Sequence, residues 1–193
     1  MSDANLRLSP EEMQLVTDPA VILTKNSVMA KVIETMAGLS EGYRAVWEEV
    51  DRGFGATSPK ISRGENYRGL PWVMLDYPRF FGREEVFAIR TMFWWGHAFS
   101  VTLHLKGRYK ALCLPVIEQN WPVLGAAGFH VGISGDEWRH EHLPDNYGVI
   151  SGAEDLKRGT EFLKLSAAVG LHRWETVPES LMSMFKTLIA VLF

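Results

Sequence analysis

The segment from Lys60 to Lys106 constrains the fold most strongly, because its apolar residues largely alternate with polar ones as in β-strands. Turn-forming residues divide this segment into four predicted strands, at residues 60–68, 71–77, 86–95 and 98–106. Short turns can join antiparallel strands, whereas parallel strands need long crossover connections. The segment therefore predicts a largely antiparallel sheet at the centre of the protein.

Helical patterns flank these predicted strands. The N-terminal part, residues 1–57, contains the capping-box order of Ser9 and Glu12, followed by apolar residues at helical spacing. The C-terminal part, residues 151–193, ends in a predicted helix from Pro178 to Phe193 that is apolar on nearly every side. A helix of this kind is buried either in its own domain or against a second subunit. We expect core burial, with a homodimer contact through this helix as the alternative.

Three further expectations complete the predicted architecture. A hairpin is expected from Phe129 to Leu143, a helix over residues 153–165, and a break in the N-terminal helix at Gly38. We find no internal repeat and no linker that would divide the chain. The sequence therefore predicts one α+β domain over residues 1–193, with a largely antiparallel sheet of about six strands, mainly in residues 58–150, between N-terminal and C-terminal helices.

The register of the hairpin over residues 86–106 decides which of its side chains share a face. Gly96-His97 suits a two-residue type II′ turn, which places Trp95 opposite Ala98. In this register one face is apolar except for a single charge, Arg90. Its apolar members are Val86, Ala88, Met92, Trp94, Phe99, Val101, Leu103 and Leu105.

Two features of this hairpin indicate a ligand site. An unpaired charge on a buried face is costly, so Arg90 should pair with a carboxylate such as Asp76 or bind an anionic ligand. The opposite face combines aromatic side chains with hydroxyl groups and an imidazole, which is typical of ligand pockets. Residues 59–110 also carry nine basic and only four acidic side chains, which favours an anion. The candidate ligand-binding residues are Arg90, Thr91, Phe93, Trp95, Ser100, Thr102 and His104.

The strongest candidate for a metal site surrounds two histidines in residues 138–142. On a strand, His140 and His142 point to the same face, so both rings can reach one divalent cation. Asp145, or His130 from the preceding predicted strand, supplies a third candidate ligand. A divalent metal is therefore a candidate cofactor, although the sequence requires none. No known nucleophile motif accompanies the histidines, and the catalytic residues stay unassigned.

Composition narrows the remaining classes of protein. The chain has 193 residues, of which 47% are hydrophobic and 22% charged, as in ordinary globular proteins. A net charge of −3 makes a nucleic-acid partner unfavourable, and no apolar run reaches the length of a membrane span. A lone cysteine, Cys113, excludes an internal disulfide and lies in an apolar stretch that suits an unreactive thiol. Residues 1–5 lack a secretory pattern, so we expect a cytoplasmic protein.

Three functions are compatible with these patterns, and no motif identifies a family. The first is a small-molecule-binding protein with an aromatic, histidine-lined and anion-accepting pocket on the 86–106 hairpin. The second is a metal-dependent enzyme that uses His140 and His142. The third is a non-catalytic association protein whose interface is the C-terminal helix. A deep pocket would favour the first function, a bound metal the second, and a large apolar patch without a pocket the third.

Overall fold

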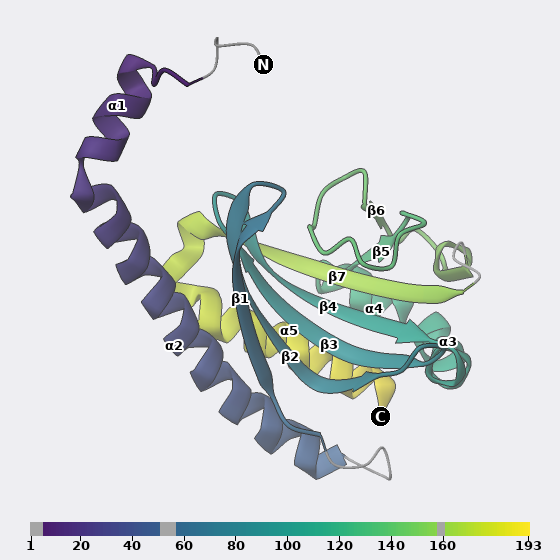
Figure 1. Ribbon diagram of the computed structural model, residues 1–193. Coiled ribbons are helices and arrows are strands. Elements are labelled where there is room, and N and C mark those ends of the chain that lie inside the picture. Colours follow the sequence, from purple (N-terminus) through teal and green to yellow (C-terminus); the bar gives the residue numbers. More distant parts are fainter. Residues whose placement is uncertain (1–5, 51–56, 158–160) are drawn as a thin grey trace.

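The computed structural model describes residues 6–50, 57–157 and 161–193 (Figure 1). The expectation about residues 1–5 therefore lies outside the described residues. The described chain forms one α+β domain with a seven-stranded antiparallel sheet, so the predicted fold class is confirmed, with seven strands in place of about six. The α-helices are α1 (Pro10–Thr17), α2 (Pro19–Val50), α3 (Arg108–Gln119), α4 (Trp121–Ala126) and α5 (Val177–Leu192). Short 3₁₀ turns, η2 (Ala153–Lys157) and η3 (Leu171–Thr176), flank the last strand.

The sheet is built from one continuous run of strands and one late insertion. The strands are β1 (Lys60–Tyr67), β2 (Leu70–Phe81), β3 (Val86–Trp94), β4 (Ala98–Lys106), β5 (His130–Gly132), β6 (Tyr147–Val149) and β7 (Phe162–Gly170). Their order across the sheet is β1-β2-β3-β4-β7-β5-β6. The first four strands pair in chain order, which includes the predicted pairing of β3 with β4, whereas β7 returns to lie between β4 and β5. Strand β1 is one edge of the sheet, and the short strand β6 is the other.

Helices α2 and α5 cover one face of the sheet, which we call the helix face (Figure 1). Alternate residues of the central strands point toward it and are fully buried, among them Phe87, Ile89 and Leu103. Tyr43 of α2 stacks on Phe185 of α5 with 3.9 Å between ring centroids, which joins the two helices over the sheet. The predicted burial of the C-terminal helix is confirmed. That burial occurs within its own domain.

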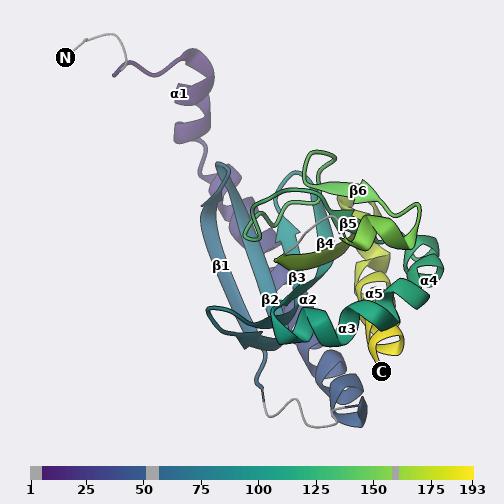
Figure 2. The same cartoon turned by 90° about the vertical axis from the view of Figure 1, so that its right-hand side faces the viewer.

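The opposite face, which we call the loop face, is covered by the connection between β5 and β6, residues 133–146 (Figure 2). The predicted hairpin from Phe129 to Leu143 is therefore wrong, because β5 pairs with β6 and the residues between them form a long loop. The helix expected over 153–165 is also wrong: this stretch contains η2 and the start of β7. The helical prediction did not recognise the alternation of apolar residues along β7, which is a signature of a strand.

The N-terminal helix is longer than predicted. Helix α2 continues through Gly38 without a break, because packing on the sheet offsets the roughly 1 kcal/mol that one glycine costs a helix. The capping box predicted at Ser9 and Glu12 is present and starts α1. Helix α1 and the first turns of α2 project from the body, and Met29 is the first buried residue of α2 (Figure 1).

The hairpin between β3 and β4 differs from its predicted register by one residue. Three residues, Trp95 to His97, connect the strands, so Trp94 rather than Trp95 lies opposite Ala98. Gly96 takes the left-handed conformation (φ 73°) that such a loop needs. A shift of one residue moves every side chain of one strand to the other face. The apolar face predicted for β3 therefore shares its side of the sheet with the hydroxyl groups and the histidine of β4.

Candidate functional site

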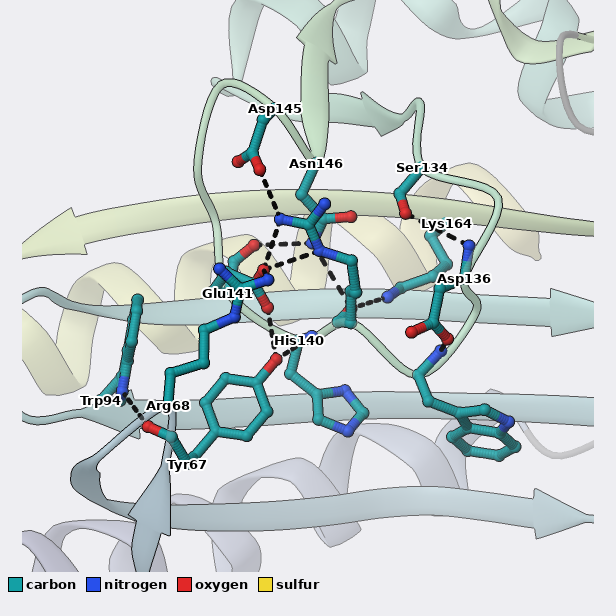
Figure 3. Close-up of polar contacts among 12 residues, drawn as sticks. Tyr67, Arg68, Trp94, Ser134, Asp136, His140, Glu141, Asp145, Asn146 and Lys164 are labelled. Atoms are coloured by element: carbon teal, nitrogen blue, oxygen red, sulfur yellow. Dashed lines mark hydrogen bonds and ion pairs between the residues drawn. The ribbon is translucent and has the colours of Figure 1, made fainter. Parts of the chain in front are cut away.

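Polar side chains of the sheet and of the covering loop meet on the loop face and form a cluster (Figure 3). We call this group the polar cluster. Strands contribute Tyr67, Asp76, Arg90, His104 and Lys164, and the covering loop contributes Glu137, Arg139, His140 and Glu141. The alternation of the strands explains the arrangement, since every second residue of β2, β3, β4 and β7 points to this face.

The structure separates the seven predicted ligand-binding residues into two groups. Four of them, Arg90, Ser100, Thr102 and His104, share the loop face. Thr91 and Phe93 lie instead on the helix face, where the Thr91 hydroxyl lies 3.1 Å from that of Tyr43. Trp95 lies in the connecting loop and packs against the same core. The aromatic wall and the hydroxyl row predicted to share one face thus lie on opposite faces, because the turn has three residues.

Arg90 forms the ion pair that the sequence predicts. Its Nε lies 2.7 Å from Oδ1 of Asp76, the residue directly opposite on β2. The two side chains are only 14% and 7% exposed, so the pair is largely removed from water. The guanidinium also lies 3.5 Å from Nδ1 of His140 and 5.3 Å from the centre of the Phe81 ring. Arg90 is thus held from three sides by the protein itself.

Glu141 joins the covering loop to the β1–β2 hairpin. Its fully buried carboxylate accepts a hydrogen bond from the Tyr67 hydroxyl and pairs with Arg139 at 2.6 Å and Arg68 at 2.7 Å. Burial raises the pKa of this carboxyl, but the hydrogen bonds from Tyr67 and Arg139 outweigh burial and lower it overall. The Tyr67 hydroxyl accepts in turn from the backbone N–H of His140 at 2.8 Å. Glu141 is therefore held as a carboxylate by positive and hydrogen-bonding neighbours.

His104 is a fully buried histidine that is neutral at pH 7. Burial, followed by the positive charge of Lys164, lowers its pKa to about 4. Its Nε2 lies 3.1 Å from the Glu137 carboxylate, which also accepts from the ammonium of Lys106 at 2.8 Å. Glu137 comes from the covering loop, so these contacts attach that loop to β4.

Lys164 is a buried cation of the polar cluster. It lies on β7, and burial followed by the charge of Arg90 lowers its pKa to about 8. The ammonium donates to the carbonyl oxygen of Arg139 and lies 5.5 Å from the centre of the Tyr147 ring. Lys164 therefore holds the backbone of the covering loop at a third point.

The four predicted metal ligands are distributed over three separate contacts. His140 lies against Tyr67 and Arg90, whereas His142 stacks on Tyr147 with ring centroids 5.2 Å apart. The His130 ring stands edge-on to His142, and Asp145 pairs with Arg139 at 2.8 Å. The strand that was expected to align His140 with His142 is a loop. Among the described residues, no three His, Cys, Asp or Glu side chains are grouped as a metal site requires.

Sequence reasoning missed the residues that organise this face, most clearly Glu141 and Lys164. Glu141 lies between the two histidines that drew the metal hypothesis, and a carboxylate beside Arg139 was a signal of ion pairing. Lys164 fell within the predicted helix, so its position on a sheet face could not be recognised. Tyr67 carried no signal, because its partner is 74 residues away in the sequence.

The polar cluster can bind its own loop, since side chains of the sheet contact side chains and backbone groups of the loop. Its contacts with Tyr67, His104 and Lys164 hold residues 133–146 on the loop face. Open grooves lie elsewhere. One of about 580 Å³ runs between α2 and β1, and others of about 580 and 360 Å³ lie along α5. The geometry therefore favours a structural role for the polar cluster.

The largest run of exposed apolar side chains lies on the projecting N-terminal helices, residues 6–28, which we call the arm (Figure 1). None of the residues of α1 is buried. The body contacts the arm through an ion pair between Lys25 and Glu65 of β1. The exposed large apolar residues of the arm are Leu6, Leu8, Met13, Leu15, Val16, Val21, Ile22 and Leu23.

Comparisons with models of protein families, with curated proteins and with solved structures found no match to this chain. None of the described helices combines the length and the apolar character needed to cross a membrane. The functional argument therefore depends on the geometry of the arm and of the polar cluster.

Proposed function

We propose that this chain is a non-catalytic association protein whose arm docks against another protein chain. The observation that carries the proposal is the exposure of large apolar residues along the arm, such as Leu15 at 59% and Leu23 at 65%. Exposed apolar patches of this kind mark interaction sites in folded proteins. The exposed apolar residues support the N-terminal arm as the proposed interface, instead of the C-terminal helix, which the core buries.

The energetics of the arm support this proposal. A helix as short as α1 is marginal in water, and the capping box at Ser9 offsets only about 1 kcal/mol of that instability. Burying four side chains such as Leu15, Val16, Ile22 and Leu23 would contribute on the order of 6–12 kcal/mol. That gain is comparable to the roughly 4–15 kcal/mol that two chains lose in translational and rotational freedom when they associate. A docked arm is therefore energetically reasonable, and it would stabilise α1.

The ligand and metal hypotheses receive less support from the same structure. The polar groups expected to receive an anion are occupied by protein partners, as Asp76 occupies Arg90. His140 and His142, which were expected to bind one metal ion together, lie against different neighbours. The proposal also keeps the cytoplasm as the compartment, which suits a chain with one buried thiol and no disulfide.

A site-specific photo-crosslinker in living cells tests the proposal. Placed at Leu15, the crosslinker should yield an adduct heavier than the chain itself. The matched control is Leu112, an equally exposed leucine (66%) on α3, at the far side of the molecule from α1, and it should yield none (Figures 1 and 2). Equal labelling at both positions, or none at Leu15, would overturn the proposal.

Truncation supplies the second measurement. At a protein concentration where the chain is monomeric, removing residues 1–17 should leave the melting temperature unchanged within about 2 °C, because no residue of α1 is buried. The same truncation should abolish the adduct formed through a crosslinker moved to Leu23. A truncated protein that melts far lower would show that the arm stabilises its own body, contrary to the proposal.

A further inference from the structure

We propose that the partner of the arm is a second copy of this chain, whose α2 lies antiparallel along the groove between α2 and β1. This inference rests on the proposed function and specifies its partner. The groove has a volume of about 580 Å³. Helix α2 lines it with Met29, Ala30, Ile33 and Ala37, and β1 contributes Arg63 and Glu65.

The exposed side of α2 changes from large to small residues along its length. Leu23, Ala30 and Ala37 are seven residues apart, so they lie along one line of the helix, with Asn26 and Ile33 beside them. Leu23 is exposed on the arm, whereas Ala30 and Ala37 are exposed where the helix crosses the body. One helix therefore carries both an apolar projection and a shallow surface able to receive it.

A two-fold axis that passes beside Ala30 makes this surface self-complementary. In an antiparallel pair, residue numbers at the same height add up to twice the number on the axis, so Leu23 lies over the partner's Ala37. The partner's Leu23 lies over Ala37 in return, as an isologous contact requires. Small residues let two helices approach closely, and the leucine fills the space above the alanine. In the same register Asn26 lies opposite Glu34 of the other copy, and this polar pair among Leu23, Ala30 and Ile33 favours a single register.

The area of such a contact is sufficient for a stable dimer. Burying one Leu, Ile or Val side chain removes about 60–120 Å² of apolar surface from water. The residues Leu15, Val16, Ile22 and Leu23 of two arms together would bury about 500–1,000 Å². The opposing groove walls add a comparable area, so the total exceeds the roughly 1,000 Å² expected of a specific interface.

The edge strand beside the groove argues for a helix as the occupant. Strand β1 carries Lys60, Arg63 and Glu65, and its pairing with β2 is irregular between Gly64 and Tyr67. Charged side chains and bulges on an edge strand oppose the addition of another strand. An apolar helix seated on the alanine line of α2 contacts that edge through the side chains of Arg63 and Glu65 and does not pair with its backbone.

Sedimentation equilibrium of the full chain tests this inference. The wild-type protein should be a dimer at micromolar concentration, and Leu23→Asp and Ala37→Trp should each weaken dimerisation at least tenfold. Circular dichroism should show unchanged folding, because both residues are exposed. The control Leu112→Asp should leave the dimer intact. Oxidation of Ala30→Cys should link two copies covalently, since residues on the axis meet each other, whereas Lys186→Cys on α5 should not.

Three outcomes would overturn the inference: a monomeric wild-type protein, a dimer insensitive to both α2 substitutions, or equal linking at positions 30 and 186. A monomer that still forms an arm adduct of another mass in cells would refute self-association alone. The proposed association function would then stand. Absence of both the dimer and the adduct would refute the inference and the proposed function together.

Discussion

Replacing Arg90 by methionine should destabilise the protein by about 3–5 kcal/mol. The magnitude follows from the burial of its partner, because the Asp76 side chain is only 7% exposed and would lose the guanidinium at 2.7 Å. An unpaired buried carboxylate loses the attraction of its partner and regains little hydration. The expected loss is therefore far larger than for an ion pair at the surface.

The double variant separates the value of the pair from the penalty of breaking it. Arg90→Met combined with Asp76→Leu removes both charges and keeps apolar volume, so it should unfold within about 1 kcal/mol of the wild type or be more stable. The single change Asp76→Leu should destabilise as strongly as Arg90→Met. The two single effects should then exceed the double effect by at least about 3 kcal/mol, which is the signature of direct coupling.

Urea unfolding followed by tryptophan fluorescence measures these free energies, with seven tryptophans as reporters. The matched control is Arg83→Met, which breaks a pair with Glu84 whose side chains are 96% and 81% exposed. That control should cost less than about 0.5 kcal/mol, as surface pairs do. If Arg90→Met costs no more than Arg83→Met, or if the double variant shows the sum of the single effects, the reasoning from burial is wrong.

Three further measurements examine other parts of the fold. The pKa of His104 is lowered to about 4, so the folded protein binds a proton at this imidazole less tightly than the unfolded chain does. The free energy of unfolding should therefore fall by about 3 kcal/mol between pH 6.5 and pH 4. The variant His104→Gln should show a smaller fall. A pH dependence that is identical in the variant would contradict this. Phe185→Asp should leave no cooperative unfolding transition, because that ring is fully buried against Tyr43, and a folded monomeric variant would refute core burial of α5. Burial raises the pKa of the Cys113 thiol to about 11, so a thiol reagent should modify it only at the rate of unfolding, and rapid labelling of native protein would show access to α3.

Local patterns were sufficient to predict the first half of the sheet. Strands β2 to β4 are rich in β-branched and aromatic residues, and strands β1 to β4 follow one another through short turns, so each pairs with its neighbour in sequence. The pair of Arg90 and Asp76 was predictable for the same reason, since the two residues oppose each other on adjacent strands. The all-round apolar character of α5 likewise indicated its burial. These features depend on contacts between neighbouring elements, which sequence periodicity reports directly.

Contacts between distant segments could not be predicted in the same way. Strand β7 pairs with β4 across more than 50 intervening residues, and its alternating apolar residues indicate a strand without indicating which strand it joins. The faces of the 86–106 hairpin depended on whether its turn had two or three residues, and Gly96 suits both. Predicting the polar cluster required both the position of β7, which carries Lys164, and the register of β4, which decides the face on which His104 lies. The predicted grouping of the candidate site residues was therefore wrong, although several of these residues do lie together on the loop face.

The contrast between the polar cluster and the arm decides where a function can reside. On the loop face, buried charged groups have partners in the protein: Glu141 pairs with Arg68 and Arg139, and Lys164 donates to the carbonyl oxygen of Arg139, so the cluster stabilises the loop that covers it. On the arm, apolar side chains such as Leu15 have no matching surface within the described part of the chain. Exposed apolar surface adds nothing to the stability of the body, whereas it supplies the driving force for association. The arm is therefore the part of this molecule for which we propose a partner.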